Sequence, residues 1–153
     1  MARHPKITFI GAGSTVFMKN IVGDVLQRPA LSGATIALMD IDRKRLEESE
    51  IVVNKLISTL GVAAKAKTYL DQRQALDGAD FVVVSILPGS FDDMANDIDL
   101  PAKAGILQSV GDTVGPGGFL RAMRAIPAMF QIGRAIGQYC PQALVCNLTN
   151  PMS

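Results

Sequence analysis

Phe9-Ile-Gly-Ala-Gly-Ser-Thr-Val16 is the stretch that decides the fold. It follows a short β-rich run at residues 6–10, and a helical pattern of apolar residues begins directly after it. Gly11 permits a tight turn, and Gly13 would let the backbone approach a pyrophosphate held by the unpaired N–H groups of the helix N-terminus. Ser14 could cap that helix or donate to a phosphate oxygen. The stretch therefore predicts a strand, a turn and a helix that together bind a dinucleotide.

The glycine pair alone is a weak signal, because Val16 stands where the usual third glycine would be. The second apolar run, residues 34–39, strengthens it. Asp40 ends that run, at the position where a carboxylate accepts hydrogen bonds from the adenosine ribose. No arginine directly follows Asp40, although Arg43 and Arg45 are near, so we expect NAD rather than NADP.

Strand-like and helix-like segments alternate along the rest of the chain, which is typical of a parallel sheet built from βαβ units. The pattern predicts an α/β fold of the Rossmann type, a doubly wound parallel sheet of about five strands with helices on both faces. We expect Asp42 to cap the second helix and Pro127 to kink or split the last one. The expected strands are 6–10, 34–39, 65–70, 81–87 and 143–148, and the expected helices are 16–28, 41–60, 97–104 and 119–139.

Length and composition favour a single folded domain over residues 1–153. The chain is 48% hydrophobic and 19% charged, with a net charge of +1. No basic run suggests a nucleic acid or a membrane surface as a partner. Two cysteines and no signal-peptide pattern make a reducing, cytoplasmic setting the expectation.

Three polar segments follow predicted strands or precede predicted helices on one edge of the sheet. Ser85 to Ser90 follows the fourth strand, and Thr149-Asn150-Pro151 follows the last. Asp112 and Thr113 lie in the glycine-rich segment 111–118, where glycines let the backbone come close to a ligand. Because the carboxyl ends of parallel strands meet at one edge, we expect the three segments to converge.

These segments resemble the N-terminal half of the NAD-dependent glycoside hydrolases of family 4, most closely the α-galactosidase branch. GDTVGPGG together with a terminal TNPM is the specific part of the resemblance. The loop LPGSFDDM lacks the arginine expected of a phospho-glycosidase, so a non-phosphorylated sugar fits better. The matching stretches are FIGAGSTVFMKN, LMDID, GADFVVVSI, QSVGDTVGPGGFLRAMRAIP and CPQALVCNLTNPMS.

The resemblance implies hydrolysis of O-glycosyl bonds by NAD-dependent oxidation at the sugar C3, elimination at C1 and addition of water. It implies a divalent metal, usually Mn²⁺, and a small-molecule glycoside as substrate. We expect a homo-oligomer for another reason, because the fifth strand would be an exposed edge and the helix from Phe119 would leave apolar residues without a partner surface. The resemblance also assigns residues. The cofactor would be bound by Gly11, Gly13, Ser14, Thr15, Asp40, Ser85 and Pro88, and the sugar by Asn150, Asp112 and Thr113.

In the family, the metal-binding Cys and His and the catalytic base follow the Asn-Pro-Met turn. We therefore expect a C-terminal catalytic domain to be absent from this chain, and no catalytic or metal-binding residue within it. Cys140 and Cys146 are expected to be buried structural thiols. The chain should bind NAD without hydrolysing glycosides.

Two other functions remain open. A lactate- or malate-type dehydrogenase shares the fold and an Asn-Pro at the same strand end, but it would carry an arginine-rich loop in place of LPGSFDDM. A stand-alone NAD-binding module without catalysis would also explain the lack of a catalytic base.

Overall fold

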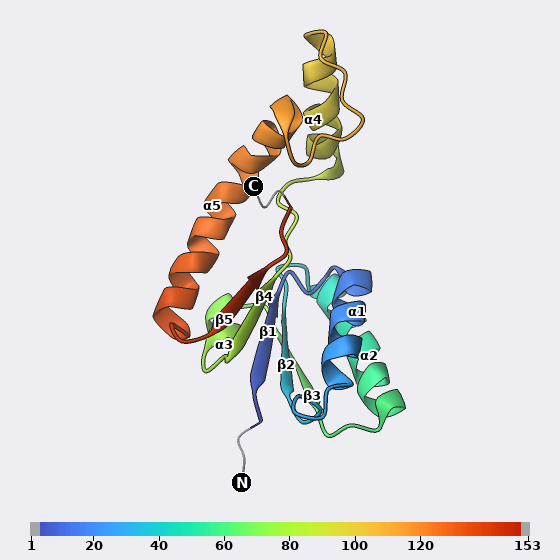
Figure 1. Cartoon of the computed structure of the whole chain (residues 1–153), viewed down its shortest axis with the longest axis vertical. Coiled ribbons are helices and arrows are strands. Elements are labelled where there is room, and N and C mark those ends of the chain that lie inside the picture. The colour runs from blue at the N-terminus through green and yellow to red at the C-terminus, as the bar shows by residue number, and fades with distance from the viewer. Residues whose placement is uncertain (1–3, 151–153) are drawn as a thin grey trace. The chain divides into compact units, whose positions relative to one another are not determined.

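The computed structural model describes residues 4–150 and contains a five-stranded parallel sheet in the order β3-β2-β1-β4-β5 (Figure 1). The predicted doubly wound, Rossmann-type sheet is confirmed. The strands are β1 Lys6–Ile10, β2 Thr35–Met39, β3 Lys65–Tyr69, β4 Phe81–Val84 and β5 Leu144–Asn147. The helices are α1 Thr15–Leu26, α2 Arg43–Leu60, α3 Gln72–Leu76, α4 Phe91–Lys103 and α5 Gly115–Tyr139.

The chain divides into two compact units. The first holds the whole sheet and comprises the chain up to Ile86 together with Ala135–Asn147. The second comprises Leu87–Arg134 and the residues from Leu148 onward. Helix α5 contributes its last turn to the first unit and the rest to the second.

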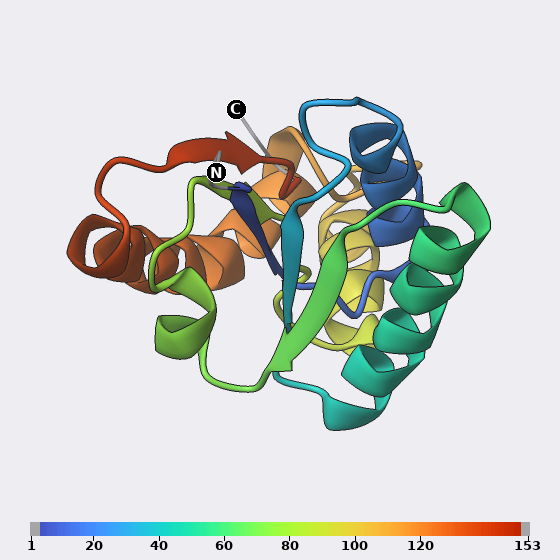
Figure 2. The ribbon, with the colours of Figure 1, turned by 90° about the horizontal axis from the view of Figure 1, so that it is seen from below.

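Helices cover both faces of the sheet in the first unit. Figure 2 shows α1 and α2 on one face, and α3 with the last turn of α5 on the other. Strands β1, β2 and β4 are almost fully buried because both their faces are covered, which explains their nearly continuous apolar sequences. The core on the α1–α2 face is built around Val22, Ile36 and Val53, each fully buried.

The winding direction of the chain reverses between β1 and β4. From β1 the chain moves outward through β2 to β3, and then crosses back to β4 on the other side of β1. The carboxyl ends of these two strands therefore flank a topological switch point, the usual place for a ligand in an open α/β sheet.

The helices of the second unit begin earlier than the sequence predicts. Helix α4 begins at Phe91 rather than Asp97, because Ser90 and Asp93 form a capping box at its N-terminus. Helix α5 begins at Gly115 rather than Phe119, because the side-chain oxygen of Gln108 accepts the N–H of Gly117 at 3.0 Å.

Pro127 lies inside α5 and does not split it in two, which was one of the two effects expected of this proline.

Within residues 4–150, no helix is long and apolar enough to cross a membrane.

Candidate functional site

The turn after β1 is pressed against the end of β4 in the first unit. Gly11 has φ +87°, and a Cβ there would overlap the carbonyl oxygen of Ser85. Only glycine combines this backbone angle with so close an approach. The turn is also held from the other side, since the N–H groups of Gly11 and Ala12 both donate to the carbonyl of Met39 at 3.0 and 2.9 Å.

Asp40 lies beside this turn, at the carboxyl end of β2. Its Oδ2 accepts the N–H of Gly13 at 2.7 Å, and its Oδ1 accepts the N–H of Asp42 at 3.0 Å. A Cβ on Gly13 would lie 2.7 Å from that Oδ2, so any other residue here would displace the Asp40 side chain. A carboxylate accepts about four hydrogen bonds, so roughly two positions on Asp40 remain for a ligand.

Helix α1 begins without a side-chain cap, whereas Asp42 caps α2 as predicted. Ser14 occupies the cap position of α1, but its hydroxyl makes no capping bond, contrary to one of the two roles expected of it. Among residues 4–150, no acceptor faces the N–H groups of Thr15, Val16 and Phe17. This exposed N-terminus is suited to an anion, because its free N–H groups and the helix dipole both favour negative charge.

Ser49 on α2 supports the turn and was missed by the sequence reasoning. Its hydroxyl is fully buried and donates to the carbonyl of Ala12 at 2.7 Å, and the Thr15 hydroxyl lies 3.2 Å from it. The hydroxyl of Thr15 is thus directed toward α2. Ser49 lies on the buried stripe of α2 between Leu46 and Val53, and a serine on an otherwise apolar stripe was the available signal.

A small hollow with a mostly apolar lining lies between the start of α1 and the ends of β1 and β4. It is lined by the turn and the start of α1 on one side and by Val83 and Ser85 of the β4 end on the other. Its volume is about 10 Å³, or room for roughly one water molecule. It lies at the switch point, and several of its lining residues, such as Phe9 and Met18, are buried.

In the second unit, the structure brings together all three predicted sugar-binding residues. The Nδ2 of Asn150 donates to Asp112 Oδ2 at 2.9 Å, and Thr113 Oγ1 donates to Asn150 Oδ1 at 3.1 Å. The amide of Asn150 is therefore held on both sides. One N–H and one lone pair of it remain for a ligand.

Arg121 joins this cluster and was also missed. Its Nε donates to the main-chain oxygen of Asn150 at 3.0 Å. Asn150 is the last residue that the structure describes, so the Pro151 and Met152 of the predicted motif lie outside that part of the chain. We call Asp112, Thr113, Arg121 and Asn150 the Asn150 cluster.

An ion pair with a buried carboxylate lies on α4 where the glycine-rich loop packs. Arg124 donates to both carboxylate oxygens of Asp97, at 2.8 and 2.6 Å, and Asp97 is only 2% exposed. Cβ atoms on Gly111 and Gly117 would lie within 3.0 Å of the Asp97 main chain. These glycines therefore serve the close packing on α4 of the loop that carries Asp112 and Thr113.

Pro88, predicted to lie beside the nicotinamide, is half-buried in the loop before α4.

Cys140 is buried, as expected, and burial raises the pKa of its thiol. Cys146 is exposed, which contradicts the expectation of a second buried thiol, because β5 is an edge strand of the sheet. Among residues 4–150, no group of three or more His, Cys, Asp or Glu is placed to hold a metal ion.

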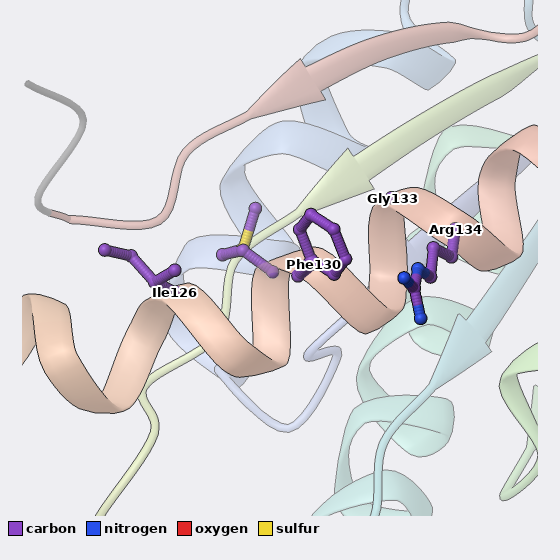
Figure 3. Close-up of a pocket in the computed structure, with 5 residues that line it drawn as sticks. Ile126, Phe130, Gly133 and Arg134 are labelled. Atoms are coloured by element: carbon purple, nitrogen blue, oxygen red, sulfur yellow. The ribbon is translucent and has the colours of Figure 1, made fainter.

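A separate groove runs along α5 in the second unit. Figure 3 shows Ile126, Phe130, Gly133 and Arg134 on its wall. The guanidinium of Arg134 lies over the Phe130 ring, 4.6 Å from its centre. The groove is mostly apolar and exposed, and Arg134 is the one polar side chain in its lining, so it lacks the converging polar groups of a catalytic site.

Comparison with known proteins adds to this geometry. The model of family 4 glycosyl hydrolases matches residues 6–153. The chain belongs to this family. An α-galacturonidase of Thermoanaerobacterium saccharolyticum is 46% identical over 149 residues, which are 96% of this chain and 32% of the relative. An α-galactosidase of Bacillus subtilis is 42% identical over 97% of this chain and 34% of the relative.

Two solved structures are similar to this chain over nearly its whole length. The putative glucosidase LplD of Bacillus subtilis matches with a TM-score of 0.87 and 40% identity, over 98% of this chain and 34% of the other. The 6-phospho-β-glucosidase of Thermotoga maritima, solved with manganese, NAD⁺ and glucose-6-phosphate, matches with a TM-score of 0.80 and 27% identity, over 95% and 35%. This family 4 chain thus spans about a third of the length of its relatives.

Family membership decides against the dehydrogenase alternative. The stretches that carried the resemblance all lie within the matched residues 6–153.

Proposed function

We propose that this chain is the NAD-binding part of a glycosidase that acts on α-linked, galactose-configured sugars. The observation that carries the proposal is the position of the hollow. It lies at the switch point between β1 and β4, beneath the uncapped start of α1. The carboxylate of Asp40 is joined to the same turn through the N–H of Gly13. Family membership and the α-galacturonidase and α-galactosidase relatives support the choice of substrate.

The residues of the first unit fit a dinucleotide. The free N–H groups at the start of α1 and the exposed hydroxyl of Ser14 would bind the pyrophosphate. Gly11 and Gly13 would serve by shaping the turn that places these donors. Thr15 would contribute through its main-chain N–H, because its hydroxyl is engaged by Ser49.

Asp40 would accept hydrogen bonds from the adenosine ribose on its two remaining positions. The same carboxylate would repel the 2′-phosphate of NADP, so NAD is the expected cofactor. Ser85 would lie on the nicotinamide side, because it lines the hollow at the end of β4. Pro88, three residues further on, is assigned to that side by the family resemblance.

In the second unit, Asn150 would bind sugar hydroxyls with the free half of its amide, while Asp112 and Thr113 fix the amide's orientation. When bound, NAD supplies a hydride acceptor for a sugar hydroxyl carbon, and manganese a Lewis acid. The groups that would hold the metal and act as base are proposed to follow the Asn-Pro-Met turn, outside this chain.

Isothermal titration of the chain with NAD⁺ tests the cofactor assignment. We expect saturable binding of NAD⁺ and weaker binding of NADP⁺. Asp40→Asn should weaken NAD⁺ binding about tenfold, since it removes a charged acceptor. Asp42→Asn is the matched control: it changes a nearby carboxylate that caps α2, and it should leave the affinity unchanged. No binding of NAD⁺, or equal losses in the two variants, would contradict the proposal.

A further inference from the structure

Asp97 lies where α4, α5 and the loop between them meet in the second unit. Both oxygens of its carboxylate accept hydrogen bonds from Arg124 on α5, at 2.8 and 2.6 Å. Its main chain lies against the loop, because Cβ atoms on Gly111 and Gly117 would approach the carbonyl oxygen of Asp97 too closely. The residue is 2% exposed, so one buried point joins the two helices and the loop that connects them.

Arg124 also contacts the turn that precedes α4. Gly89 in this turn has φ +103°, and a Cβ there would lie 2.9 Å from Arg124 Nε and 3.0 Å from Asp93 Oδ2. A positive φ and so close an approach both favour glycine, which lets the turn that carries Pro88 lie against the guanidinium. After the hydrogen bonds from Ser90, the charge of Arg124 is a further cause that lowers the pKa of the Asp93 carboxyl. Arg124 thus links this turn to α4.

The two contacts belong to different sides of the proposed site. The turn carries Pro88, which the family resemblance assigns to the nicotinamide side. The loop carries Asp112 and Thr113, which orient the amide of Asn150. The ion pair, the turn and the loop all lie in the second unit. Oxidation of a sugar by NAD needs the sugar carbon and the nicotinamide at a fixed separation, and a misplacement of about 1 Å can slow a reaction roughly a hundredfold.

We propose that Asp97 and Arg124 are positioning residues that set the cofactor side and the sugar side of the proposed site relative to each other. The pair fixes the turn at 88–89 and the loop at 112–113 from one buried point, and it acts through these segments rather than on a ligand. The inference rests on the proposed function, because it takes this turn and the Asn150 cluster as the two sides of that site. A buried ion pair contributes little net stability over apolar residues of the same volume, which favours a role in positioning.

A pair that only joined α4 to α5 would affect stability and nothing else. A positioning pair should in addition transmit the binding of NAD⁺ from the turn to the loop. Gly117 is suited to report this, because it is buried and its N–H donates to the side chain of Gln108 at 3.0 Å. Its exchange with solvent is therefore expected to depend on opening of the loop rather than on contact with a ligand.

The test is amide hydrogen exchange at Gly117, measured by NMR on the ¹⁵N-labelled chain with and without saturating NAD⁺. In the wild type, we expect NAD⁺ to slow this exchange at least about fivefold. In Asp97→Asn, exchange at Gly117 should be about tenfold faster without NAD⁺, and NAD⁺ should no longer slow it. Exchange at Gly13, in the first unit, should be the same in both proteins without NAD⁺, which excludes a general loss of stability.

The partner residue tests the same interaction from the other side. Arg124→Gln should reproduce the effect of Asp97→Asn, and combining the two should add little, because each removes the same ion pair. The double variant also serves if a single substitution, which leaves a buried group unpaired, prevents folding. Arg124→Lys should retain part of the effect, since lysine keeps the charge without the two-bond geometry.

Asp99→Asn and Arg134→Gln are the matched controls. Asp99 is an exposed carboxylate on α4, and Arg134 lies over the Phe130 ring on α5. Each substitution removes the same charge from the same helix as its counterpart in the ion pair. Both should leave the effect of NAD⁺ on exchange at Gly117 intact.

An exchange rate at Gly117 that NAD⁺ does not change in the wild type, an effect that survives Asp97→Asn, an equal acceleration at Gly13, or a loss in either control would each overturn the inference. The calorimetric titration with NAD⁺ separates these results from failure of the proposed function. A chain that binds NAD⁺ under any of these outcomes loses only the role of the ion pair, whereas a chain that does not bind NAD⁺ loses both.

Discussion

At Gly11 the chain has no room for a side chain. Gly11→Ala would place a methyl group against the Ser85 carbonyl and force alanine to a φ of +87°. We expect the free energy of unfolding in urea to fall by about 1–3 kcal/mol. Gly23→Ala is the control: it lies inside α1 with open space around it, and it should stabilise the chain by roughly 0.5–1 kcal/mol. Similar effects of both substitutions would contradict the close contact with Ser85.

Ser49 illustrates a polar residue whose role depends on its surroundings. Ser49→Ala would leave the Ala12 carbonyl without its buried donor, so we expect a loss of about 1–2 kcal/mol in the free energy of unfolding. The turn would loosen as well, and the affinity for NAD⁺ should fall. Ser58→Ala, on the exposed side of the same helix, should change neither measurement. An unchanged stability in the Ser49 variant would show that the buried hydrogen bond contributes little.

At the scale of elements, the capping box of α4 carries a pH dependence. The main-chain N–H and the hydroxyl of Ser90 donate to Asp93 and lower the pKa of that carboxyl below its ordinary value of 3.8. A carboxyl whose pKa is lower in the folded state stabilises the fold above its ordinary pKa, and the contribution disappears as the pH falls through the lowered pKa.

We therefore expect the stability difference between the wild type and Asp93→Asn to shrink as the pH is lowered from about 5 to below the folded pKa. Urea denaturation at a series of pH values measures it. Asp92→Asn also removes a first-turn charge, but it leaves the bonds between Ser90 and Asp93 in place. If both variants follow the same pH curve, the capping box is not the cause.

At the scale of the whole molecule, the chain is about a third as long as its relatives. We expect it to bind NAD⁺ and to release no product from an aryl α-galactoside or α-galacturonide in the presence of Mn²⁺, because the family resemblance assigns the metal ligands and the base to the segment beyond the Asn-Pro-Met turn. Release of the aryl group is followed by absorbance. Metal-dependent turnover by this chain would contradict the expectation.

Exposed apolar side chains support the prediction of self-association. Four of them lie at helical spacing on α5, and each is 60–65% exposed: Phe119, Met123, Ile126 and Phe130. Sedimentation at rising concentration should show an increasing mass. The pair Met123→Glu and Phe130→Glu should reduce it, whereas Ile41→Glu, which removes an isolated exposed side chain, should not. A mass independent of concentration would remove the basis for the homo-oligomer.

The sequence alone was sufficient for the order of the five strands along the chain, four of the five helices, the doubly wound sheet, the turn after β1 and the cap at Asp42, whereas the short helix α3 was not among the expected helices. These depend on periodicity and turn chemistry, which act between residues close in the chain. It also indicated, through the family resemblance, that Asp112, Thr113 and Asn150 share a site, and the structure places them in hydrogen-bonding contact.

Only the tertiary structure decided which groups complete these sites. Ser49 reaches Ala12 across 37 residues, and Arg121 reaches Asn150 across 29. Three further features also depend on tertiary packing: the hydrogen bond between Gly13 and Asp40, the glycines packed on Asp97, and the exposure of Cys146 on an edge strand. The physical reason is that such contacts form only when separate elements pack together, and no local propensity in either segment specifies its partner.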